Sequence, residues 1–207
     1  MIKKETYSDQ IYEEIKQDIL NRRIGLGEKL INRELQQRYG VSSTPVRDAI
    51  NRLYQEGFVE GISRAGARVI NFDRNYAEEL VEIIAMISDN AVKLSAIKSD
   101  RRAVAAELGK KIQLQQKHIN NEKYYQHNKE FHKVFFKYAK NKTLTQLYDQ
   151  FDIRQEIMIR YTDLVDMEQR RLMIKHHQDI YEAYLNDDIL LARKLMEDHY
   201  LDAIKHL

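Results

Sequence analysis

The chain has 207 residues, of which 43% are hydrophobic and 32% are charged, a composition that can bury a core and excludes a disordered protein. The formal net charge of +2 excludes a strongly basic protein, so a role in binding nucleic acid must rest on where the positive charges lie. Cysteine is absent, which excludes disulfides, thiol catalysis and thiolate metal sites. No apolar run has the length of a membrane span and no signal core follows Met1, so we expect a cytoplasmic protein with no membrane partner.

Turn-forming residues are concentrated near the start of the chain. The single proline is Pro45, and six of the seven glycines lie between Gly25 and Gly66. The rest of the sequence has the pattern of long helices. We therefore expect a mainly α protein with one domain over residues 1–71, a linker over 72–76 and a helical domain over 77–207.

Two helices are predicted before residue 40. Apolar residues at Ile11, Ile15 and Ile19 recur at helical spacing after Thr6 or Ser8 as the cap, and this helix should end near residues 21–23. A loop follows, and then Asn32 can cap a short helix over residues 33–39 that is ended by Gly40.

A third helix is predicted to begin near Pro45. Proline suits the first turn of a helix because its fixed φ is helical, and Thr44 can cap that turn. Apolar residues fall on one face, while Arg47 and Arg52 lie away from it. A short helix, a tight turn and a helix with outward arginines form the helix-turn-helix arrangement.

Two short strands over residues 58–62 and 67–71, joined by a turn over 63–66, complete a winged helix-turn-helix domain. Arg64 should lie at the tip of this wing. Arg33, Arg47, Arg52 and Arg64 then occupy the places where a winged helix meets phosphates and base edges, and we predict that the domain binds double-stranded DNA.

This segment resembles the GntR family of regulators almost continuously over residues 8–71. The matching stretches are 30–35, 40–50, 53, 56–59 and 66–69. The resemblance implies that Arg33, Thr44, Arg47 and Gly66 contact DNA. Ser43 stands where the family usually has arginine, so we expect altered base readout at one operator position. With the neighbouring residues, the predicted DNA-binding set is Arg33, Ser43, Thr44, Pro45, Arg47, Arg52, Arg64 and Gly66.

The remainder of the chain predicts a bundle of about six helices. Leu80, Ile84, Ile87 and Leu94 belong to the apolar stripe of a first long helix. Five further helices are predicted over residues 103–119, 124–139, 144–161, 168–185 and 189–204.

All seven histidines follow residue 117, and three of them can converge inside this bundle. Asn128 and His132 are four residues apart and share a helix face, while His177 and His199 lie on the last two helices, which a short loop makes antiparallel. Imidazoles bind divalent metals such as Zn, Ni or Mn. The alternative is a set of buried histidines held by hydrogen bonds without a metal.

The helical region resembles the FCD ligand-binding domain of FadR-type GntR regulators. The matching blocks are residues 128–132, 141, 144, 177–188, 192 and 199. The resemblance implies a divalent metal held by one aspartate and three histidines, with a small carboxylate effector bound against it. The histidines carry over as His132, His177 and His199, but Asn128 stands at the aspartate position, so we expect weaker metal binding.

A second departure affects the effector site. The family often has a Glu-x-Arg pair and a further glutamate on its first long helix, where this chain has Glu82, Ile84 and Ser88. We expect Ser88, Arg154 and Arg160 to bind the effector. The two arginines are candidates to replace the missing arginine, and the alternative is that both lie on a solvated helix face.

Together these patterns predict a homodimeric transcription regulator, a repressor rather than an activator, whose hinge lies at residues 71–75. A small effector would shift the population of DNA-binding arrangements. One alternative is a metal-responsive regulator that uses the same histidines. An enzyme with a histidine-bound metal is a weaker alternative, because no catalytic motif accompanies the cluster. A non-specific architectural DNA protein is disfavoured by the near-neutral net charge.

Overall fold

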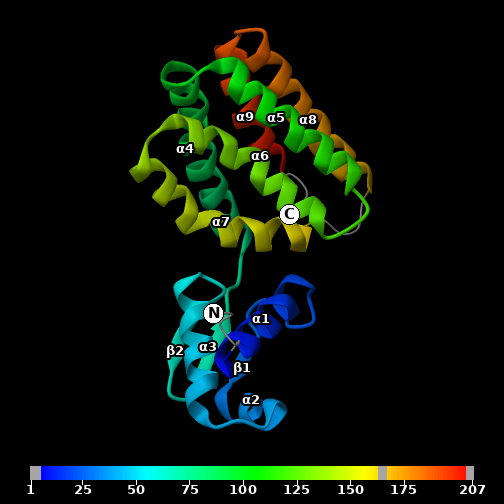
Figure 1. Ribbon diagram of the computed structural model, residues 1–207. Coiled ribbons are helices and arrows are strands. Elements are labelled where there is room, and N and C mark those ends of the chain that lie inside the picture. Colours follow the sequence, from blue (N-terminus) through cyan, green and yellow to red (C-terminus); the bar gives the residue numbers. More distant parts are fainter. Residues whose placement is uncertain (1–5, 163–166, 204–207) are drawn as a thin grey trace, which may run out of the picture. The chain divides into compact units, whose positions relative to one another are not determined.

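The computed structural model describes residues 6–162 and 167–203, and it divides into two compact units, Met1–Asp73 and Arg74–Leu207 (Figure 1). The first unit combines helices with a small antiparallel sheet, and the described part of the second unit is helical. This confirms the predicted fold class. No helix among the described residues is long and apolar enough to span a membrane.

The N-terminal unit is a winged helix-turn-helix. Its elements are α1 (Tyr7–Leu20), β1 (Lys29–Ile31), α2 (Asn32–Tyr39), α3 (Ser43–Gln55), β2 (Val59–Ser63) and β3 (Gly66–Val69). The strands form an antiparallel sheet in the order β1-β3-β2. The sequence analysis missed β1, because three residues are too few to show a strand period.

Two predicted helix caps are wrong. The residue before α3 is Ser42, and Thr44 already lies inside the helix. Ile31 precedes α2, and the Asn32 side chain instead donates to the Arg64 carbonyl at 2.8 Å, which ties α2 to the wing. The prediction of Thr6 as the cap of α1 is confirmed, because Thr6 and Asp9 form a reciprocal capping box.

Apolar side chains of α1 and α3 form the centre of this unit. Ile15, Ile19, Val46 and Leu53 have no measurable exposed surface. Around them, the buried carboxylate of Asp18 accepts hydrogen bonds from α2 and from the loop after α1. Burial alone would raise the pKa of Asp18, but the hydrogen bonds from Arg38 and Arg23 outweigh it and lower that pKa. The short α2 is thereby held against α1 by charge as well as by packing.

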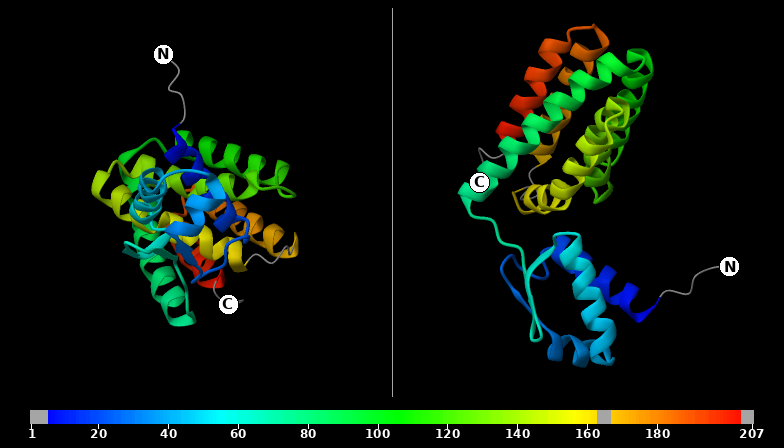
Figure 2. Two further views of the ribbon diagram at one scale, coloured as in Figure 1. Left: turned by 90° about the horizontal axis from the view of Figure 1, so that it is seen from below. Right: turned by 90° about the vertical axis from the view of Figure 1, so that its left-hand side faces the viewer.

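The C-terminal unit contains α4 (Arg74–Lys98), α5 (Arg101–Lys117), α6 (Lys123–Ala139), α7 (Lys142–Thr162), α8 (Met167–Leu185) and α9 (Ile189–Ala203). Helix α6 packs against α4, α5 and α7, while α9 packs against α4 and α8 (Figure 2). Residues 74–76, expected in the linker, form the first turn of α4. The predicted end of the last helix at Ile204 lies outside the described residues.

Gly66 is the position where the wing depends on glycine. Its φ is +143°, and a Cβ atom there would lie 1.8 Å from the Leu30 carbonyl oxygen of β1. We expect Gly66→Ala to destabilise the N-terminal unit by about 3 kcal/mol or more, because β1 would have to separate from β3. Urea unfolding followed by circular dichroism measures this change.

Gly61→Ala is the matched control for that prediction. Gly61 also has a positive φ, +61°, but open space surrounds its Cβ position. Only the conformational cost of about 1 kcal/mol should appear. Equal losses of stability in the two variants would contradict the steric explanation.

Candidate functional site

Three histidine side chains meet in the interior of the C-terminal unit. His132 of α6, His177 of α8 and His199 of α9 are all buried, with 2%, 0% and 5% of their surface exposed. Each of the three Nε2–Nε2 distances is 3.3 Å. The structure therefore brings together the three histidines that the sequence singled out.

The triangle of nitrogens has the size that a metal ion requires. Nitrogen ligands at about 2.0–2.1 Å from a tetrahedral zinc ion lie about 3.3–3.4 Å from one another. Burial lowers the pKa of His132 to about 3 and also lowers the pKa of His177 and of His199. The imidazoles are therefore neutral near pH 7, and a neutral imidazole has the nitrogen lone pair that a metal needs.

A hydrogen-bonded chain orients one of these ligands. The Nδ1–H of His177 donates to Oε1 of Gln115 on α5 at 2.8 Å, which leaves the Nε2 lone pair of His177 directed at the other two rings. The phenyl ring of Phe131 stacks on the His177 ring with centroids 3.9 Å apart. The Nδ1 atoms of His132 and His199 have no hydrogen-bond partner among the described residues, so these rings are held by packing.

Asn128 is buried one helical turn before His132, and its side-chain amide is hydrogen-bonded to Gln115, the same residue that orients His177. Its Oδ1 accepts a hydrogen bond from Nε2 of Gln115 at 3.2 Å. That bond competes with a role of this oxygen as a metal ligand, so ligation by Asn128 stays a prediction. The sequence analysis missed Gln115, although it lies on the apolar stripe of its helix with Val104, Leu108 and Ile112.

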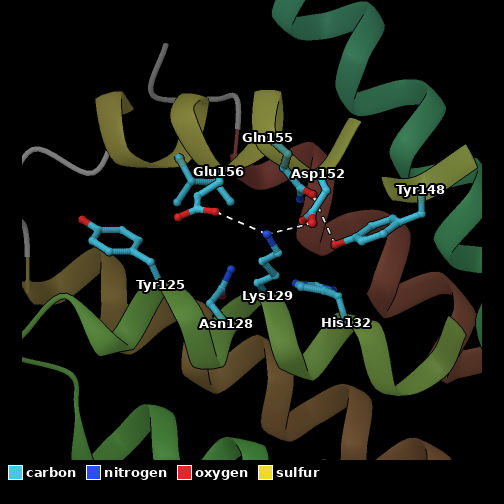
Figure 3. Close-up of a pocket in the computed structure, with 9 residues that line it drawn as sticks. Tyr125, Asn128, Lys129, His132, Tyr148, Asp152, Gln155 and Glu156 are labelled. Atoms are coloured by element: carbon cyan, nitrogen blue, oxygen red, sulfur yellow. Dashed lines mark hydrogen bonds and ion pairs between the residues drawn. The ribbon is translucent and has the colours of Figure 1, made fainter. Parts of the chain in front are cut away.

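A pocket adjoins the histidine triangle between α6 and α7 (Figure 3). The ammonium of Lys129 lies within it, 2.8 Å from Oδ2 of Asp152 and 3.4 Å from Oε2 of Glu156. Its lining residues come from facing surfaces of the two helices: Tyr125, Asn128, Lys129, His132, Tyr148, Asp152, Gln155, Glu156 and Ile159.

The residues predicted to bind the effector lie outside this lining. Ser88 is buried and donates to the Tyr200 hydroxyl at 3.2 Å. Arg160 lies over the Tyr125 ring and pairs with Glu122 and Glu156. Arg154 is half-buried on α7 and does not line the pocket either. The side of α7 that lines the pocket towards α6 carries the carboxylates of Asp152 and Glu156, and neither of the predicted arginines.

The predicted DNA-binding residues of the N-terminal unit fall into two groups. Arg33, Arg47 and Arg64 are exposed and form no salt bridge within the part of the chain that the structure describes. Ser43 and Thr44 are also exposed, in the first turn of α3, and Pro45 is half-buried beside them. These residues are free to meet a ligand outside the domain.

Arg52 and Gly66 have structural roles that the sequence analysis did not anticipate. The Arg52 guanidinium lies 3.6 Å from the centre of the Tyr12 ring and is hydrogen-bonded to Asp9 and Glu56, so it fastens α3 to α1. Gly66 is buried against β1. Contact of either residue with DNA stays a prediction.

Comparison with known families gives two matches. The model described as bacterial regulatory proteins, gntR family, matches residues 7–69, and the FCD domain model matches residues 79–202. A relative in Bacillus subtilis (strain 168), named as the uncharacterized HTH-type transcriptional regulator YdhC, is 22% identical over 97% of this chain and 91% of its own length. The Nta operon transcriptional regulator of Aminobacter aminovorans is 27% identical over 74% of this chain and 72% of its own length.

Solved structures share the fold of the whole chain. The E. coli protein McbR/YncC has a TM-score of 0.74 and 18% identity, with 96% of this chain and 95% of that chain covered. The Lar protein, described as controlling expression of the Listeria monocytogenes agr system, has a TM-score of 0.72 and 22% identity, with 99% of this chain and 97% of that chain covered. The matched families and named relatives are regulators of transcription, which confirms the expectation that the chain is not an enzyme.

Proposed function

We propose a function for this chain, which belongs to the GntR family of bacterial regulatory proteins and carries an FCD domain. It is a homodimeric repressor, and a small carboxylate at a metal site controls its binding to operator DNA. The chain is a DNA-binding transcription regulator by family. Ligand control, repression, the metal and the dimer are the parts we add.

The equal spacing of 3.3 Å between the three Nε2 atoms carries the proposal of a metal. His132, His177 and His199 would hold the ion, and Gln115 would keep His177 in the tautomer that can bind it. When bound, the ion supplies positive charge that attracts a carboxylate. The adjoining pocket gives that carboxylate a place next to His132.

We assign DNA contact to exposed arginines that form no salt bridge among the described residues. Arg47 and Arg33 lie on the two helices of the helix-turn-helix, and Arg64 lies in the turn that joins β2 to β3 in the wing. Exposed guanidinium groups without internal partners can make bidentate contacts with phosphates or guanine edges.

We predict that Arg47→Ala weakens binding to a DNA site, selected from a random library by the unaltered protein, by roughly tenfold or more. Fluorescence anisotropy with labelled duplex measures the dissociation constant. Arg102→Ala, which removes an exposed arginine of α5, is the control and should leave the constant unchanged. Unaltered affinity in Arg47→Ala would sink the assignment of α3 as the recognition helix.

The metal site makes its own prediction. Protein incubated with zinc and then dialysed should hold about one ion per chain by elemental analysis, and His177→Ala should hold none, because three nitrogen ligands act together. His118→Ala is the control, since that histidine lies outside the cluster. Asn128→Asp should bind zinc roughly tenfold more tightly, because it adds a carboxylate beside the site. Zinc retained by His177→Ala would refute the site.

A second copy of the chain is proposed to pack on α4. One face of this helix is buried in the bundle, yet on the other face Ile83, Met86 and Ile97 expose 42%, 63% and 68% of their surface. These residues are spaced by three and eleven, so they lie along one helical stripe. A self-complementary stripe of this kind suits a two-fold interface, and two winged helices would then read a near-palindromic site.

Light scattering of the full chain tests the dimer. Met86→Lys should convert the dimer to a monomer, because it places a charge at the centre of an apolar interface. Leu191→Lys, at an exposed leucine of α9, should remain dimeric. A dimer that persists in Met86→Lys and dissociates in Leu191→Lys would locate the interface elsewhere.

A further inference from the structure

The side chain of Lys129 fills the pocket beside the histidine triangle. Its ammonium lies between Asp152 and Glu156 of α7 (Figure 3). The free space around it is about 10 Å³, close to the minimum for one water molecule. A ligand larger than water therefore needs a lining side chain to move, and the Lys129 side chain lies in the middle of the pocket (Figure 3).

The carboxylates that hold Lys129 are largely removed from solvent, with 9% and 16% of the side-chain surface of Asp152 and Glu156 exposed. Each also pairs with a second cation, which contacts the same Oδ2 in Asp152 and the other oxygen, Oε1, in Glu156. The Lys133 ammonium is 2.9 Å from Asp152, and the Arg160 guanidinium is 3.1 Å from Glu156. Neither Lys133 nor Arg160 lines the pocket.

Departure of Lys129 would leave Oδ2 of Asp152 with one cation in place of two, and would remove from Oε2 of Glu156 the ammonium that it contacts. Shielded carboxylates that lose a partner raise the free energy of the protein unless another donor replaces it. The remaining side chains on the α7 wall, Tyr148, Gln155 and Ile159, carry no positive charge. A molecule that enters this pocket therefore stabilises the complex most if it brings a positive charge of its own.

The two ends of the pocket thus favour opposite charges. We infer that the effector is a small aminocarboxylate, which directs its carboxylate to the three-histidine site and its protonated amine to Asp152 and Glu156. The amine takes the place of the Lys129 ammonium. This inference rests on the proposed metal site and adds the class of ligand to it.

Lys129 is then a competitor of the ligand and not its anchor. Both ammonium groups need the same two carboxylates, so removing Lys129 should strengthen binding of an aminocarboxylate. If Lys129 were instead the anchor of the ligand carboxylate, its removal would weaken binding. The two roles therefore predict opposite effects of Lys129→Met on the affinity for an aminocarboxylate.

The experiment uses two matched sets of probes on the zinc-loaded full-length protein: alanine, lactate and propionate, and 4-aminobutyrate, 4-hydroxybutyrate and butyrate. Within each set the carboxylate and the number of carbon atoms are the same. The three members differ only in carrying an amine, a hydroxyl or no substituent at one carbon. Isothermal titration calorimetry gives each dissociation constant. We expect the amine of at least one set to bind roughly tenfold or more tightly than its hydroxyl and unsubstituted partners.

Four variants test whether the pocket carboxylates cause the tighter binding of the amino compound. Asp152→Asn should abolish this preference for the amino compound. Asp149→Asn, which removes an exposed carboxylate that also pairs with Lys133, should keep it. Lys129→Met should bind the preferred amine roughly tenfold more tightly. Lys137→Met, two turns further along α6 and paired with Glu107, should bind it as the unaltered protein does.

The outcomes separate this inference from the function on which it rests. Equal or tighter binding of the hydroxy acid or plain carboxylate, or weaker binding of the amine in Lys129→Met, overturns the inference and leaves the metal site standing. Zinc-loaded protein that binds no probe overturns it as well. Protein that takes up no zinc contradicts both proposals, and elemental analysis of the same sample identifies that case.

Discussion

The C-terminal unit depends on the meeting of three imidazoles from three helices at one buried point. Their Nε2 atoms lie 3.3 Å apart, within bonding reach of a common ion. Burial keeps the rings neutral, so three lone pairs facing one another repel unless a proton or a cation lies among them. The fold maintains this arrangement by packing α6, α8 and α9 together and by fixing His177 through Gln115.

The pocket between α6 and α7 adjoins this cluster. His132 faces the histidine triangle and also lines the cavity towards α7, so the cluster and the cavity form one site with two ends. At the far end a lysine bridges two carboxylates, each of which also pairs with a further cation. Such a bridge is a stable resting state, and it can also open, because each carboxylate keeps one partner when the lysine leaves.

The N-terminal unit divides its arginines between structure and recognition by the partners they have. Arg38 and Arg52 are hydrogen-bonded to acids of the same unit and hold α2 and α3 to α1. Arg33, Arg47 and Arg64 are exposed and without salt bridges among the residues described. Only the second group can neutralise phosphates without breaking contacts that stabilise the domain.

The fold and the histidine triangle could be predicted from the sequence because both depend on periodicity. Apolar spacing located the helices. Helix geometry allowed His132, His177 and His199 to converge, and the resemblance to the FCD domain implied that they share a site. Strand β1 and the first residue of α2 were missed, since they depend on pairing with the wing rather than on local pattern. Asn32 looked like a cap, but its side chain bonds to the wing backbone.

The pocket wall could not be predicted, because charged residues on a helix usually face solvent. Lys129, Asp152 and Glu156 have the pattern of surface ion pairs, and only the close approach of α6 and α7 places them inside. For the same reason the arginines of α7 seemed better candidates than its acids. A glutamine on an apolar stripe, Gln115, was the available signal for the hydrogen-bonded chain behind His177.

Crystallography of the zinc-loaded protein at the zinc absorption edge tests the central claim most directly. The three-histidine account predicts an anomalous peak about 2.0–2.1 Å from Nε2 of His132, His177 and His199 alike. A map from zinc-saturated crystals with no peak at that position, or with imidazoles turned to bond one another, would contradict it.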